Sequence, residues 1–171
     1  TMTTYKSDSP EGPWVIWYTD SDQMKEQGFH QEGIREGLTT YYYEEGTMQR
    51  EGFFKEGLPD GIWTYWNSKG EKDFDFDFGT GLQHIELEDL AERESIFYKI
   101  GDERPFTGII TQENPEADYL FLGRTKEGKK DGQWVKWFPD GKDVPEIILV
   151  DVPQPEPKMP WSGGKQEQGG Y

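Results

Sequence analysis

Three aspartates that alternate with phenylalanines are the most conspicuous candidates for chemistry in this chain. Asp73, Asp75 and Asp77 stand two residues apart, which is the ligand spacing at the start of a calcium-binding loop. Such a loop also needs glycine at its sixth position and glutamate at its twelfth, where this chain has Phe78 and His84. The pattern instead predicts a β-strand with carboxylates on one face and phenylalanines on the other. We therefore expect no metal site here.

Catalytic arrangements are equally sparse. The two histidines, His30 and His84, stand apart from any serine or aspartate pattern typical of nucleophilic catalysis or of a metal site. Cysteine is absent, which excludes disulfides, thiol nucleophiles and thiolate ligands. Paired acid–base work needs two carboxylates apposed in a cleft, which sequence alone cannot show. We predict a protein that is not an enzyme, with no catalytic residue, metal or cofactor.

The charge of the chain narrows the class of partner. Its 34 acidic residues against 18 basic ones give a net charge of −16. Nucleic acid and anionic membrane surfaces are disfavoured as partners because both need a basic patch. An acidic surface attracts basic protein partners, although the charge can also serve solubility alone. We expect a protein partner, and a basic one.

A repeat of about 24 residues organises the chain. The stretch from Glu56 to Trp66, E-G-L-P-D-G-I-W-T-Y-W, has near-copies from Glu32 to Tyr42 and from Glu127 to Trp137, and a shorter one from Glu11 to Trp17. Only 32% of residues are apolar, whereas 15% are aromatic, a balance suited to covering a thin sheet rather than filling a thick core. Each unit is predicted to be strand, turn, strand and turn, with glycines in the turns.

Tryptophans recur in two registers, two and five residues after the second glycine of each unit. The first register holds Trp14, Trp63 and Trp134, and the second holds Trp17, Trp66 and Trp137. A separation of three predicts that the two registers face opposite sides of the sheet. One set then forms the core, while the other covers the back of a thin ribbon, contacts a dimer mate or binds a partner. We take Asp73, Asp75 and Asp77, with the second register, as the candidate partner-binding residues.

The predicted fold is all-β, with repeated β-hairpins that form one extended, twisted antiparallel meander sheet. We expect an N-terminal segment at residues 1–10, the hairpin array at 11–151 and a Pro/Gly-rich, unstructured tail at 152–171. A degraded unit falls at about 82–104. Within it, residues 87–95 are expected to form a short helix or a polar turn, and residues 96–100 a strand.

Two motifs and one longer segment resemble a known family. The motifs are the repeated G-x-W-x-x-[WY] strands and the G-x-x-[DE]-G connections, and the segment runs from Asp89 to Gly108 and ends in P-F-T-G. With them the chain resembles the MORN-variant repeat proteins of bacteria, often labelled YwqK-family antitoxins, over roughly residues 10–150. The resemblance implies a hairpin meander, and it implies no cofactor and no catalytic residue.

We therefore expect a protein-binding repeat module, an antitoxin or immunity-type protein that neutralises a basic toxin or effector. The alternative is a structural or envelope-associated scaffold that self-associates, so a homo-oligomer stays open. No apolar run reaches the length of a membrane span, and no signal peptide is visible. Because Thr1 precedes Met2, we take Met2 as the native start. A cytoplasmic location is expected, or a periplasmic or envelope location if a leader has been removed.

Overall fold

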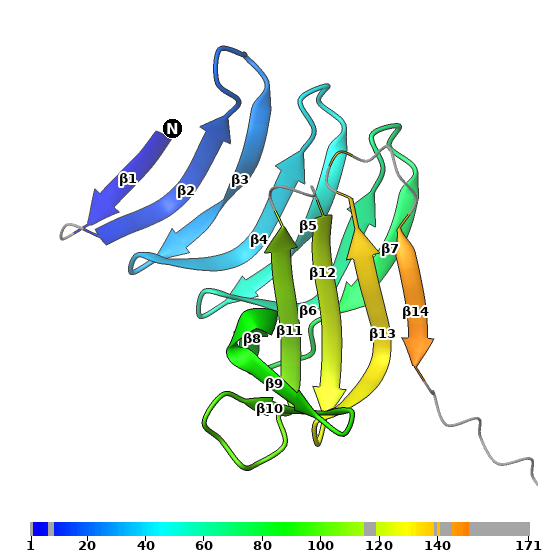
Figure 1. The fold of residues 1–171 in the computed structure, drawn as a ribbon. Helices are drawn as coiled ribbons and strands as arrows, with labels where there is room; N and C mark the ends of the chain where they lie inside the picture. The colour runs from blue at the N-terminus through cyan, green and yellow to red at the C-terminus, as the bar shows by residue number, and fades with distance from the viewer. Residues whose placement is uncertain (1, 7–8, 115–118, 139, 141–144, 151–171) are drawn as a thin grey trace, which may run out of the picture.

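A computed structural model describes residues 2–6, 9–114, 119–138, 140 and 145–150. Seven strands form a first sheet in chain order, and each is antiparallel to the next (Figure 1). We call it sheet 1. Its strands are β1 (Met2–Lys6), β2 (Ser9–Trp17), β3 (Met24–Gln31), β4 (Ile34–Tyr42), β5 (Met48–Lys55), β6 (Leu58–Trp66) and β7 (Lys72–Asp77). This confirms the all-β hairpin meander.

A second sheet, sheet 2, has five strands in the order β14, β13, β12, β11, β8. Its strands are β8 (His84–Glu86), β11 (Gly108–Asn114), β12 (Tyr119–Lys126), β13 (Lys129–Trp137) and β14 (Glu146–Val150). The insert before β11 is a 3-10 turn, η1 (Leu87–Asp89), followed by a hairpin of β9 (Leu90–Arg93) and β10 (Ile96–Lys99). The expected strand at residues 96–100 is therefore present as β10. The short helix or polar turn expected at residues 87–95 is correct only at its start, because β9 forms a strand that pairs with β10. The expected tail, 152–171, lies outside the described residues.

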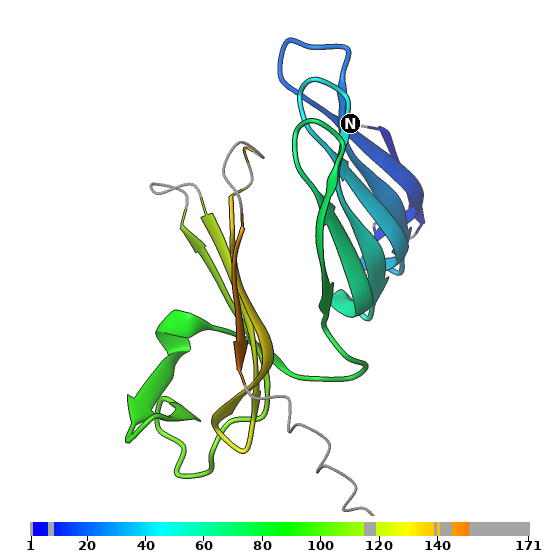
Figure 2. The same ribbon diagram turned by 90° about the vertical axis from the view of Figure 1, so that its right-hand side faces the viewer.

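The array is divided between two sheets, whereas the sequence predicts one. After Phe78 the chain turns at Gly79 and Gly81, which have φ of 66° and 67°, and sheet 2 lies against one face of sheet 1 (Figure 2). Strand β8 pairs in parallel with β11 instead of extending the meander from β7. The degraded unit therefore ends the first sheet and begins a second layer.

The two sheets share one hydrophobic core. Sheet 1 contributes mainly aromatic side chains and sheet 2 mainly aliphatic ones. The members are Phe54, Trp63, Tyr65, Phe74, Phe76 and Phe78 from sheet 1 and its end, and Ile109, Leu120, Leu122, Val135 and Trp137 from sheet 2. The phenylalanines of β7 and its end share one face, as the period of two predicts, and the second layer, which was not predicted, buries that face.

The two glycines of each repeat have different structural roles. Glu56 and Gly57 form a two-residue turn, with φ of 52° and 82°, which is the backbone that a tight hairpin turn needs at both positions. Gly61, with φ of 65°, lies inside β6 where the pairing with β5 shifts its register. The second glycine therefore marks a β-bulge within the strand, and the prediction that placed it in the turn is wrong.

The first-register tryptophans pack on glycines of the neighbouring strand. A Cβ on Gly52 would overlap the indole of Trp63, and one on Gly123 would overlap that of Trp134. Each indole Nε1 donates to the carbonyl that follows its glycine, Trp63 to Phe53 at 3.1 Å and Trp134 to Arg124 at 3.0 Å. Both tryptophans are 2% exposed. Of the alternatives that the sequence leaves open for a register, these two tryptophans therefore take core packing.

Candidate partner-binding face and inter-sheet cleft

Asp75 and Asp77 lie on the outer face of sheet 1, opposite the buried phenylalanines of β7. Asp75 accepts hydrogen bonds from Lys72 Nζ at 2.6 Å and from Thr64 Oγ1 at 2.8 Å, and the bond from Lys72 lowers the pKa of Asp75. Asp77 accepts the backbone N–H of Gly79 at 2.8 Å. The alternation is as predicted, and both carboxylates also have local structural partners.

Asp73 departs from that row. The pairing of β6 with β7 shifts between Tyr65 and Trp66, which pair with Phe74 and Lys72 and leave Asp73 at the irregularity. Its side chain is only partly exposed. Burial raises the pKa of Asp73, and the nearby Trp137 indole offsets part of that rise. The three aspartates therefore do not form one uniform acidic strip.

The second-register tryptophans have different environments. Trp17 is 44% exposed and Trp66 is partly exposed, but Trp137 is only 1% exposed. Trp137 packs edge-on against Tyr65 in the inter-sheet core, with the ring centres 5.0 Å apart. The prediction of Trp137 as an exposed contact residue is wrong, because the face of β13 that carries it is turned towards sheet 1.

Strand β13 confirms that the two registers lie on opposite faces. Trp134 belongs to a second core on the far side of sheet 2, with Phe97 and Phe106 from the insert and the segment after it, and with Ile110 of β11. The Phe97 and Trp134 rings lie 5.8 Å apart and are stacked. The insert therefore covers the first-register face of sheet 2.

The structure also shows a feature that sequence reasoning missed, an apolar row on the outer face of sheet 1. It crosses strands β3, β4, β5 and β6, and its side chains are between 41% and 64% exposed. Its members are Phe29, Leu38, Phe53 and Ile62. No described element covers this face (Figure 2). The sequence contains a pattern that could have revealed this row. Leu38 and Ile62 each follow a bulge glycine, and Phe29 and Phe53 occupy the same position of successive units.

Acidic and polar side chains border the apolar row. Glu36 pairs with Phe29 across β3 and β4, and Asp60 pairs with Phe53 across β5 and β6. A second row runs beside it through directly paired residues: Gln27, Thr40, Glu51, Thr64 and Asp75. Thr40 Oγ1 donates to Glu51 at 2.9 Å. The outer face of sheet 1 is thus an apolar strip with acidic margins.

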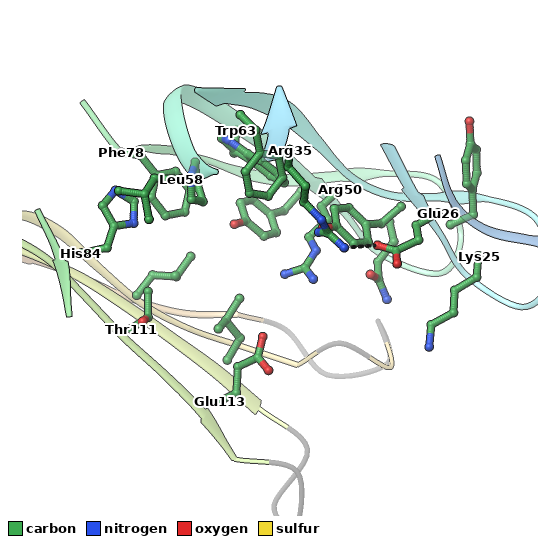
Figure 3. A pocket seen from close by; sticks show the side chains of 18 of the residues that line it. Lys25, Glu26, Arg35, Arg50, Leu58, Trp63, Phe78, His84, Thr111 and Glu113 are labelled. Carbon is green, nitrogen blue, oxygen red and sulfur yellow. Dashed lines mark hydrogen bonds and ion pairs between the residues drawn. The ribbon is translucent and has the colours of Figure 1, made fainter. Parts of the chain in front are cut away.

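A cleft of about 580 Å³ opens on the other face of sheet 1, between that sheet and the β8–β11 edge of sheet 2 (Figure 3). Its sheet-1 wall holds Glu26, Arg35 and Arg50 among aromatic side chains. Arg35 lies 3.5 Å from Glu26 and donates to the Tyr41 hydroxyl at 2.6 Å. The cleft therefore combines charged groups with a largely aromatic floor.

The histidines lie in separate packed environments. His84 stacks on Phe78 with ring centres 5.6 Å apart, and His30 lies 5.3 Å from the Trp14 ring. Burial lowers the pKa of both imidazoles. In the part of the chain that the structure describes, no group of three or more histidine, cysteine, aspartate or glutamate side chains could hold a metal ion.

No helix among the described residues is long and apolar enough to cross a membrane. Comparison with protein-family models, with curated proteins and with solved structures finds no match for this chain.

Proposed function

We propose that this chain is a non-enzymatic protein-binding module whose partner docks on the outer face of sheet 1. The observation that carries the proposal is the apolar row, where four large side chains from four adjacent strands stand exposed together. Scattered apolar residues are normal on protein surfaces, but a contiguous apolar patch with a polar rim is typical of an interaction site. Aromatic residues such as Phe29 and Phe53 are common in the centres of interfaces.

The margins of the row favour a basic partner. Glu36, Glu51, Asp60 and Asp75 flank the apolar side chains, and the whole chain carries a net charge of −16. Complementary charge around an interface accelerates association and selects among partners. An antitoxin or immunity-type role against a basic toxin or effector, as the resemblance to MORN-variant repeat proteins implies, fits this arrangement.

A self-associating scaffold is the second candidate. Sheet 1 ends in the strands β1 and β7, neither of which has a second neighbour among the described strands, and open edges can add strands from another copy. The apolar rows of two copies could also meet face to face. Their acidic margins would then oppose each other, so charge favours a basic partner over a second copy.

The test is affinity capture from the native host with a pair of matched variants. Phe53→Ser with Ile62→Ser removes the two most exposed side chains of the apolar row, whereas Ile100→Ser removes a similarly exposed side chain just after the far hairpin. We expect a basic protein that the wild type and Ile100→Ser retain and the row variant loses. Asp75→Lys should slow its association and weaken the salt dependence of the rate.

Two outcomes would reject the docking face. Capture of the same proteins by the row variant would show that the row is not the contact surface. A concentration-dependent oligomer in light scattering, abolished by Phe53→Ser with Ile62→Ser, would instead favour the scaffold.

A further inference from the structure

Arg50 lies in the cleft and has no anionic partner among the residues that the structure describes. It lies on β5 between Tyr41 of β4 and Tyr65 of β6, and it pairs with both across the sheet. Its guanidinium lies 4.2 Å from the centre of the Tyr41 ring and projects between the two walls (Figure 3). Its Nε is buried with no hydrogen-bond partner in the described chain, and it forms no ion pair with a described carboxylate.

Arg35, on the same wall of the cleft, differs from Arg50 because a carboxylate neutralises its charge. Arg35 is paired with Glu26, hydrogen-bonded to Tyr41 and placed 5.0 Å from the Trp14 ring. Arg50 has the aromatic contact, but no carboxylate in the described part of the chain pairs with it. A partly buried cation without an anion is unfavourable, so an oxyanion that enters the cleft would remove an existing cost at Arg50.

The other residues that line the cleft indicate the size and chemistry of a ligand. Phe54, Trp63 and Leu122 supply apolar surface, and a volume of about 580 Å³ is in the range of small-molecule sites. Glu86 and Glu113 line the opposite wall, and Glu113 points from sheet 2 towards the sheet-1 side (Figure 3). Glu86 accepts a hydrogen bond from Thr111 at 2.8 Å. These carboxylates would repel a second negative charge on a ligand.

We propose that the cleft binds a small apolar or aromatic monocarboxylate. The carboxylate takes the terminal nitrogens of Arg50 in the two-bonded geometry that a guanidinium offers. The body of the ligand lies on Tyr41, Trp63 and Phe54. The acidic wall selects a single negative charge over the two charges of a phosphate monoester. The site is on the opposite face of sheet 1 from the apolar row, so it stands or falls independently of the proposed partner-binding function.

The test is to titrate the full chain with three small ligands that each carry a phenyl ring and to monitor binding by NMR. They are phenylacetate, phenyl phosphate and benzyl alcohol. We expect phenylacetate to bind with a Kd on the order of 1 mM, as befits a small ligand with one strong anchor. Benzyl alcohol should bind at least about tenfold more weakly because it lacks the charge, and phenyl phosphate should also bind more weakly than phenylacetate.

Two variants assign the binding to the cleft. Arg50→Gln should weaken phenylacetate binding about tenfold, whereas the matched Arg93→Gln, at an arginine that lies over Tyr98 on the far hairpin, should leave it unchanged. Glu113→Gln removes an exposed acidic charge from the opposite wall and should tighten binding about threefold.

Absence of saturable binding by phenylacetate, or tighter binding of phenyl phosphate, would overturn the proposal. So would equal phenylacetate affinity in Arg50→Gln and the wild type. Should Arg50→Gln fail to fold, Glu113→Gln decides, since an unchanged or weakened affinity in that variant also overturns the site.

Discussion

Sheets 1 and 2 are built from the same repeat, yet they bury opposite faces of it against each other. In sheet 1 the first-register Trp63 faces the shared core, whereas in sheet 2 that core receives the second-register Trp137. The first-register Trp134 instead lies beneath the insert. The repeat specifies strands, turns and bulges, but the segment between the copies decides which face is covered.

Equivalent positions in the two sheets also carry opposite chemistry. Phe53 and Ile62 of sheet 1 are exposed and apolar. Their counterparts after the corresponding glycines of sheet 2 are Arg124 and Gln133, and Arg124 pairs with Asp131 at 2.9 Å. Burial alone does not explain apolar residues on the open face and polar ones on the face that meets the other sheet. The proposed docking of a partner on sheet 1 would account for the exposed apolar residues.

The two sheets should differ most in how much a second-register tryptophan, Trp137 or Trp17, contributes to stability. Trp137→Ala should lower the free energy of unfolding by about 3–5 kcal/mol because it empties a buried site, whereas Trp17→Ala should cost less than about 1 kcal/mol because that side chain is 44% exposed. Urea denaturation of both variants measures the difference. Equal losses of stability would contradict the finding that Trp137 is buried in sheet 2 while Trp17 is exposed on sheet 1.

A smaller effect tests what the sheets share. Gly52→Ala should cost about 1–3 kcal/mol, because the added methyl overlaps the Trp63 indole and overpacking strains a core. Gly123→Ala, the matched change against Trp134, should cost a similar amount. The same denaturation experiment serves here, and a loss in only one sheet would show that the glycine–tryptophan pair is not a common unit.

The junction between the sheets should give a modest pH dependence. Burial lowers the pKa of His84 in the folded state, so below the ordinary histidine pKa of about 6.5 the unfolded chain binds the proton more readily. Stability from this group is therefore fully present above about pH 6.5 and is lost as the pH falls through the folded-state pKa. His84→Phe should flatten that part of a stability–pH profile, and an unchanged slope would argue against the buried His84–Phe78 stack.

The smallest expected change in stability concerns Phe53, on the open face of β5. Phe53→Ser should change stability by no more than about 0.5 kcal/mol, as expected for a surface site. Its neighbour Phe54 lies in the shared core, so Phe54→Ser should cost about 3 kcal/mol or more. Thermal unfolding of the pair distinguishes them. A large loss for Phe53→Ser would mean that the apolar row serves folding and is not free to bind a partner.

Local pattern predicted a good part of this structure. The alternation of Phe74, Phe76 and Phe78 predicted that they share one face, and the repeat period predicted the hairpins. The bulge at Gly61 was not predicted, because a glycine with positive φ suits a turn and a bulge equally well. These features depend on the neighbourhood of one strand.

The remaining features depend on contacts between distant parts of the chain. Burial of Trp137 requires that the chain fold back after Phe78, and a break in a repeat does not specify where the next layer packs. The apolar row and the position of Arg50 in the cleft become visible only when several strands lie side by side. For the same reason the candidate site was predicted only in part: Asp75 and Trp17 are accessible, but the row between the acidic margins was not identified.

Thiol labelling measures directly whether the apolar row is open to solvent, and the absence of cysteine in the chain makes it simple. Ile62→Cys places one thiol in the apolar row, and Leu122→Cys places one in the shared core. In the free protein the first should react at nearly the rate of an exposed thiol and the second only on unfolding. The captured basic partner should then protect Ile62→Cys. Slow labelling of Ile62→Cys in the free protein, or unchanged labelling in the complex, would contradict an open, partner-binding face on sheet 1.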